Sequence, residues 1–152
     1  MRQRPELNRG QALRLWTALT YDRSALKPES EVMGRLEDYL LLDSERPFWL
    51  TYPPELIELV VSGEVVLTPW HLCNSDGVRH DYSALQKRLG RELIPFAHRQ
   101  DREDLACLEK GRGQEILIIH DNTEPGWEDE GGYPCFADWL RAVRAEAKDW
   151  LR

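Results

Sequence analysis

The side chains best suited to chemistry in this chain of 152 residues are histidines that lie near a cysteine or near carboxylates. His71 and Cys73 are two residues apart, so on a strand they would share one face, as a general base and a thiol nucleophile must. A catalytic dyad also needs an orienting group and an oxyanion site, and the sequence displays neither. We therefore interpret the pair as a buried cysteine beside a partly exposed histidine.

A second histidine lies close to carboxylates and could bind a metal if its loop curled. His98 is followed by Asp101 and Asp104, but divalent sites usually gather more ligands, and no EF-hand or His-Glu-x-x-His spacing is present. The adjacent His120 and Asp121 do not form a dyad, because neighbours on a strand point to opposite faces. The sequence predicts no catalytic residue, no metal site and no cofactor, and hence a protein that is not an enzyme.

The most acidic stretch of the chain surrounds a tryptophan. Residues 115–138 include seven acids and no lysine or arginine. Like charges at this density repel one another unless solvent, salt or a cationic partner screens them. One interpretation is a solvated loop with Trp127 packed into the core. The other is a recognition patch, in which an aromatic anchor within an acidic rim fits a basic partner. The candidate partner-binding residues are Asp121, Glu124, Trp127, Glu128, Asp129 and Glu130.

Length and composition predict one domain with a core of its own, since 41% of the residues are hydrophobic. Three cysteines leave one unpaired under any disulfide scheme and have no zinc-ligand spacing, which indicates free thiols in a reducing cytoplasm. No apolar run exceeds four residues, so we expect neither a membrane span nor a secretory signal.

The charge distribution disfavours direct binding to nucleic acid. The formal net charge is -7, so most of the surface would repel a phosphate backbone. Residues 1–28 are basic, with six lysines and arginines against Glu6 and Asp22, which gives at best a weak, salt-sensitive attraction.

Periodicity and capping residues predict helices first, then strands, then a closing helix. The expected elements are helices over Arg9–Ala25, Glu29–Leu42 and from Pro54 to a cap at Gly63, a strand over Val65–Leu72, a turn over Asn74–Gly77, a short helix from Asp81 or Ser83 to Leu89, strands over Leu93–Ala97, from Asp104, and over Ile116–Ile119, a turn at Gly111–Gly113, a loop over Asn122–Gly132, and a helix opened by Tyr133–Pro134. This order predicts an α+β fold, in which a mainly antiparallel sheet packs against N-terminal helices and a C-terminal helix. We divide the chain into a helical extension, residues 1–28, and a single domain, residues 29–152.

The same stretches resemble the SUKH superfamily, whose members are mostly bacterial immunity proteins against toxins, with fungal cell-wall-synthesis regulators as distant relatives. The resemblance covers roughly residues 30 to 145. It rests on VMGRLEDYL (32–40), YPPELIELVVSGEV (52–65), LIPFA (93–97), the DLACL strand that begins at Asp104, IIHDNT (118–123) and FADWL (136–140).

The resemblance implies a SUKH-like fold and a cytoplasmic protein that neutralises a cognate toxin by occluding it. Its partner would then be a basic toxin domain, docked on the acidic patch. One alternative is a regulatory module with a cellular client protein, and another is a small cysteine or metal hydrolase that uses His71, Cys73 or the His98 cluster. The oligomeric state stays open at this point.

Overall fold

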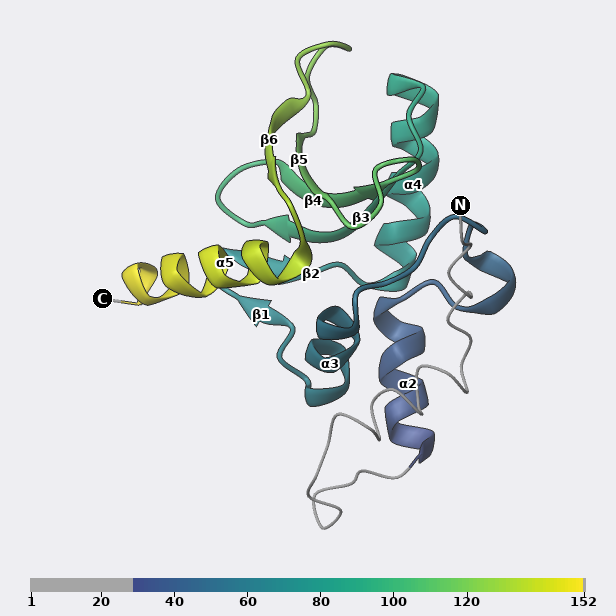
Figure 1. The fold of residues 1–152 in the computed structure, drawn as a ribbon, viewed down its shortest axis with the longest axis vertical. Helices are drawn as coiled ribbons and strands as arrows, with labels where there is room; N and C mark the ends of the chain where they lie inside the picture. The colour runs from purple at the N-terminus through teal and green to yellow at the C-terminus, as the bar shows by residue number, and fades with distance from the viewer. Residues whose placement is uncertain (1–28, 152) are drawn as a thin grey trace.

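The structure is a computed structural model that describes residues 29–151, so the helix expected over residues 9–25 lies outside the described residues. The described elements are α2 (Glu29–Tyr39), the 3-10 turn η2 (Asp43–Glu45), α3 (Pro54–Ser62), β1 (Val66–Leu67), β2 (Trp70–Leu72), α4 (Ser75–Leu89), β3 (Leu93–Arg99), β4 (Asp104–Glu109), β5 (Ile116–His120), β6 (Asp129–Tyr133) and α5 (Phe136–Trp150). Figure 1 shows α2 at one end of the long axis and the β5–β6 connection at the other.

The strands form one six-stranded sheet in chain order, and every neighbouring pair is antiparallel. Each strand therefore lies beside the one before it, and the β2–β3 connection contains α4. The prediction of an α+β fold with an antiparallel sheet packed against helices is confirmed. No helix in residues 29–151 has the length and apolar character needed to cross a bilayer.

Both faces of the central sheet are buried, which explains why its strands read as continuous apolar runs. On one face, Phe96 of β3 packs against Phe136 and Trp139 of α5, with ring centroids 5.5 and 5.1 Å apart. This main core continues into α2 and α3. On the other face, a smaller cluster includes Leu85 of α4 and alternate residues of the strands, Leu93, Leu105, Cys107, Leu117 and Ile119. Successive side chains along a strand therefore point alternately into one core and into the other.

Helix α3 forms where local signals agree. Pro53 is its N-cap and Pro54 opens the first turn, where a missing N–H has no helical partner to lose. The helix ends at Gly63, whose φ of 79° lies in the left-handed region that glycine adopts without steric cost. The predicted start and cap of this helix are both confirmed.

The single strand predicted over Val65–Leu72 is wrong. The chain reverses at the cis Thr68–Pro69 peptide bond and forms two short strands, which pair as Val66 with His71 and Leu67 with Trp70. The turn predicted over Asn74–Gly77 is also wrong, because these residues begin α4. The Asn74 side chain caps the helix by accepting a hydrogen bond from the Gly77 N–H at 2.8 Å.

The loop predicted over Asn122–Gly132 contains an additional strand, β6, at the edge of the sheet. Glycine permits this pairing: a Cβ at Gly132 would lie 2.6 Å from the Ile116 carbonyl oxygen, too close for any other residue. The register shifts between Leu117 and Ile119, so two β6 residues lie opposite one on β5. This irregularity bends the edge strand and hinders pairing with another chain.

Candidate functional site

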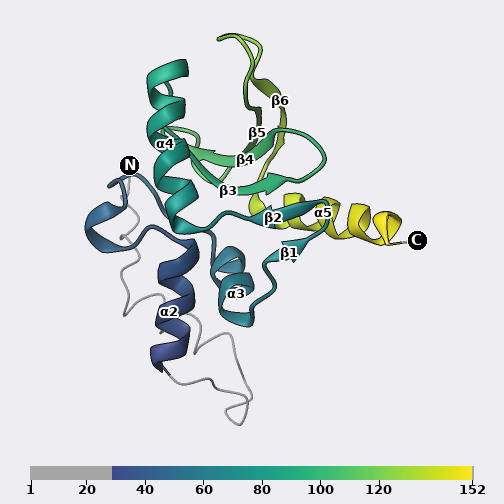
Figure 2. The ribbon, with the colours of Figure 1, turned by 180° about the vertical axis from the view of Figure 1, so that it is seen from behind.

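The acidic segment forms the connection between β5 and β6, residues 121–128, which we name the tip. It lies at the end of the molecule farthest from α2 in both Figure 1 and Figure 2. Two residues with positive φ turn the backbone here, Asn122 at 61° and Gly126 at 102°. The Trp127 N–H closes a turn by donating to the Glu124 carbonyl oxygen at 3.1 Å. The tip is therefore shaped by backbone turns, one of which is closed by this hydrogen bond.

Arg91 anchors the base of the tip to the sheet. Its Nε and Nη2 atoms donate to both carboxylate oxygens of Glu109, at 2.8 and 2.9 Å. Its Nη1 donates to Glu128 at 3.1 Å and to Asp129 at 3.0 Å. The Arg91 side chain is 19% exposed and that of Glu128 only 8%. A bidentate pair at this degree of burial holds its geometry far better than an exposed ion pair.

Glu128 is a structural residue of the tip. Its backbone carbonyl accepts from the His120 N–H at 2.7 Å, and its carboxylate accepts from the Gly126 N–H at 2.7 Å. Hydrogen bonds from backbone N–H groups, its own and that of Gly126, together with Arg91, lower the pKa of Glu128. The Glu128 side chain is thus ionised, buried and already bonded, and a partner cannot contact it without breaking these bonds.

Asp121 is also engaged within the molecule. Its side chain accepts a hydrogen bond from Arg88, near the end of α4, and its backbone N–H donates to the Glu103 carbonyl oxygen at 2.7 Å. The next residue, Asn122, bonds the Glu103 carboxylate through its side-chain amide. The start of the tip is therefore attached to α4 and to the β3–β4 connection.

The outer part of the tip faces solvent. Trp127 is 76% exposed, so it is not packed into the core as one interpretation of the sequence expected. Glu124 and Glu130 are exposed, and within residues 29–151 neither forms an ion pair. Asp129 has one bond to Arg91 and keeps a side chain that is 61% exposed. We call Glu124 and Trp127 of the tip, together with Asp129 and Glu130 at the adjoining start of β6, the crown of the tip.

The structure does not bring His71 and Cys73 together as a base and a thiol. His71 lies 2.8 Å from the Gln100 side-chain oxygen and stacks on His98, with ring centroids 5.4 Å apart. Cys73 is buried, and this burial raises the pKa of its thiol to about 12. A thiol with such a pKa is protonated near neutral pH and is a poor nucleophile.

The carboxylates near His98 are dispersed over separate contacts. Asp101 accepts from Arg99 at 2.8 and 2.9 Å, whereas Asp104 accepts from the His120 ring at 2.7 Å. Within the described residues, no three histidine, cysteine or acidic side chains gather as metal ligands would.

Sequence reasoning missed the Arg91 contacts and the pairing of His120 with Asp104. His120 and Asp104 lie directly opposite each other on β5 and β4, so their contact depends on the strand register. Arg91 follows the helix cap Gly90 and is 37 residues away from Glu128 in the sequence, so their contact depends on how the folded chain places the end of α4 beside the tip. Neither contact has a local sequence signal, because the partners are far apart in the chain.

Comparison with known proteins identified no relative. Neither a family model nor a curated protein nor a solved structure gives a significant match to this chain. The resemblance to the SUKH superfamily therefore rests on the quoted sequence segments alone.

Proposed function

We propose that this chain is a non-enzymatic protein-binding domain that recognises a basic protein surface through the crown of its tip. The observation that carries the proposal is the exposure of Trp127 on a connection that Arg91 holds in place. An exposed tryptophan is a common energetic centre of protein interfaces, because its large ring is buried on binding at a small cost in side-chain entropy.

The charges around Trp127 support a basic partner. Glu124, Asp129 and Glu130 add three carboxylates. Of these three, only Asp129 forms an ion pair with a described residue, Arg91. Attraction between these carboxylates and a cationic surface would speed association, and burial of the Trp127 ring would slow dissociation. Because the tip is preorganised, binding need not first order the loop.

The partner class that we propose first is a basic toxin domain, neutralised by occlusion of its nucleic-acid-binding face. The resemblance to SUKH immunity proteins supports this choice, and a regulatory module with a cellular client is the alternative. Free thiols at Cys73, Cys107 and Cys135 support a cytoplasmic location. A neighbouring gene that encodes a toxin-like domain would favour the immunity role, and a conserved housekeeping neighbour would favour the regulatory one.

The test is affinity capture from source cells, followed by binding measurements on tip variants. Trp127→Ala should weaken binding to the captured protein at least tenfold, about 1.4 kcal/mol. Glu124→Gln with Glu130→Gln should slow association, most strongly at low salt. Phe48→Ala is the matched control, since this ring is 73% exposed outside the tip, and it should bind as the wild type does.

Two results would contradict the proposal. One is a captured partner that binds Trp127→Ala and the double glutamine variant with wild-type kinetics. The other is a partner whose contact surface is acidic, because the crown would then repel it.

A further inference from the structure

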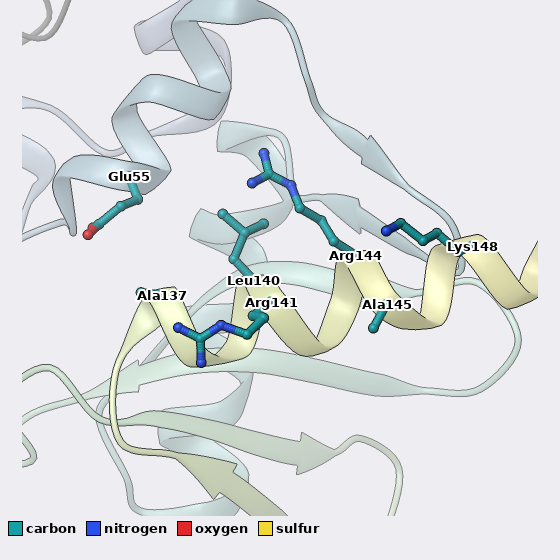
Figure 3. A pocket seen from close by; sticks show the side chains of 7 residues that line it. All are labelled: Glu55, Ala137, Leu140, Arg141, Arg144, Ala145 and Lys148. Carbon is teal, nitrogen blue, oxygen red and sulfur yellow. The ribbon is translucent and has the colours of Figure 1, made fainter.

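A shallow groove between the start of α3 and the outer face of α5 has the chemistry that the crown requires of a partner. It is lined by Leu140 and the small side chains of Ala137 and Ala145, with Arg144 and Lys148 at its rim. Figure 3 shows Arg144 and Lys148 extending from one side of α5 and Arg141 from the other, with Glu55 across from them on α3. The floor consists of Ala137 and Ala145 with the outer edge of Leu140, which is only 8% exposed, and it is bordered by cations on a chain whose net charge is -7.

The cations of this groove are available to an incoming carboxylate. Arg144 bonds Glu64 at 3.1 Å, and Arg141 bonds Asp138 at 3.1 Å, but all four side chains are 37 to 78% exposed. Exposed pairs of this kind contribute little free energy, so a new carboxylate can replace the old one at small cost. Lys148 has no ion-pair partner among residues 29–151. Among the described residues, Glu55 is the one acidic side chain that lines the groove.

We propose that this groove binds the crown of a second copy of the chain. Trp127 of one copy would cover Leu140, Ala137 and Ala145 of the next, and its flanking acids would meet Arg144 and Lys148. The proposal shares the tip with the proposed function but names its own partner. Charge complementarity and the match between an exposed indole and an apolar floor argue for this occupant.

The positions of the two surfaces make the contact intermolecular. The tip lies at one end of the long axis, whereas α5 crosses the molecule nearer its middle, so a tip points away from its own groove (Figures 1 and 2). Two different patches meet in such a contact, which makes it heterologous, and a copy bound at its groove still has a free tip. Self-association would therefore occupy the same crown that binds a foreign basic partner, and the two would compete.

The test is sedimentation velocity over a concentration series at low and at high salt, with full-length protein. The wild type should associate at low salt and dissociate as salt rises. A tip variant, Trp127→Ala, and a groove variant, Arg144→Glu with Lys148→Glu, should each sediment as monomers. Mixed together they should form a dimer that stops at two copies, because one supplies only a groove and the other only a tip.

Matched controls separate the groove from general charge effects. Lys87→Glu removes an exposed cation on α4, and the protein should still associate as the wild type does. Circular dichroism and thermal unfolding identify any variant that fails to fold. Charge reversal on both sides in one chain, with Glu124→Lys, Glu130→Lys, Arg144→Glu and Lys148→Glu together, should restore association to within tenfold of the wild type.

Three results would overturn the inference: a wild type that stays monomeric at low salt, tip and groove variants that associate as the wild type does, or a mixture of the two that stays monomeric. None of these bears on the capture experiment. If the wild type is monomeric but Trp127→Ala abolishes binding to a captured basic partner, the proposed function stands and the inference fails. If the wild type self-associates but no foreign partner is captured, only the inference stands.

Discussion

The base of the tip, Asp121 and Glu128, and its crown are both acidic but have opposite roles. At the base, Asp121 and Glu128 bond Arg88 and Arg91, and their charges are compensated within the molecule. At the crown, Glu124 and Glu130 have no ion-pair partner among the described residues, and Trp127 is exposed. The comparison teaches that an acidic stretch is not one functional unit. Its buried carboxylates order the connection, and only the remaining ones are free to bind.

The largest effect that would test this division is loss of the Arg91 guanidinium. Arg91→Ala removes the cation that Glu109 and Glu128 share, so we expect a loss of about 3 kcal/mol in the free energy of unfolding. Urea denaturation measures this change. Arg112→Ala is the control, because its contact with Glu109 is 3.6 Å long and its side chain is 51% exposed, and it should cost less than about 1 kcal/mol. Equal losses in the two variants would contradict the anchoring role.

A smaller effect should distinguish Glu128 from Glu124. Glu128→Gln keeps the shape but removes the charge from the bonds to Arg91 and to the Gly126 N–H, which should cost about 1 to 2 kcal/mol. Glu124→Gln should leave stability within about 0.5 kcal/mol of the wild type. The pair is measured by the same urea titrations. If the two substitutions lower the free energy of unfolding equally, the carboxylates of the base and the crown do not differ in their structural role.

The lowered pKa of Glu128 also predicts an acid dependence of stability. Its folded pKa lies below the unfolded value, so its contribution is present above the unfolded pKa and is lost as pH falls through the folded one. Unfolding free energies measured from neutral pH into the acid range should fall less steeply for Glu128→Gln than for the wild type. Parallel curves for the two proteins would show that Glu128 titrates alike in both states.

The smallest expected effects come from two histidines with opposite shifts. The hydrogen bond to Asp104 raises the pKa of His120, so its stabilisation is present below the unfolded pKa and is lost as pH rises through the folded one. Burial, and then the nearby His71, lowers the pKa of His98, so protonation of His98 at mildly acid pH favours unfolding. His120→Gln and His98→Gln should therefore change the slope of stability against pH in opposite directions near neutral pH. Slopes that change in the same direction would refute one of the two assignments.

The sequence predicted best the elements whose signals are local. The start of α3 at Pro54 and its cap at Gly63 need only their own backbone conformations, and β4 and β5 follow from compact apolar runs. Prediction failed where the same residue types are typical of two different structures, such as a turn and the start of a helix. The Asn74–Gly77 segment has turn composition, yet Asn74 caps α4 instead, and Ser75 is buried against α2 through its bond to the Glu37 carbonyl oxygen. Local propensity cannot weigh that tertiary contact.

For a related reason, the sequence could not predict strand β6, nor which acids in the tip are bonded within the molecule and which are free. Glycines and acids are poor strand formers, and β6 pairs only because Gly132 can approach the Ile116 carbonyl oxygen closely. The acid-rich segment with its tryptophan could be found by counting charges. Which acids are occupied depends on Arg88 and Arg91, which are about thirty residues or more away in sequence.

By itself, then, the amino-acid sequence determined the fold class, the apolar strands and the place where negative charge gathers, because these depend on residue type and short spacing. Only the tertiary structure decided which side chains at that place are free. Hydrogen bonds between distant segments occupy some carboxylates and leave others free. Such bonds form only after strand order and register bring the donor and acceptor atoms within about 3 Å of each other.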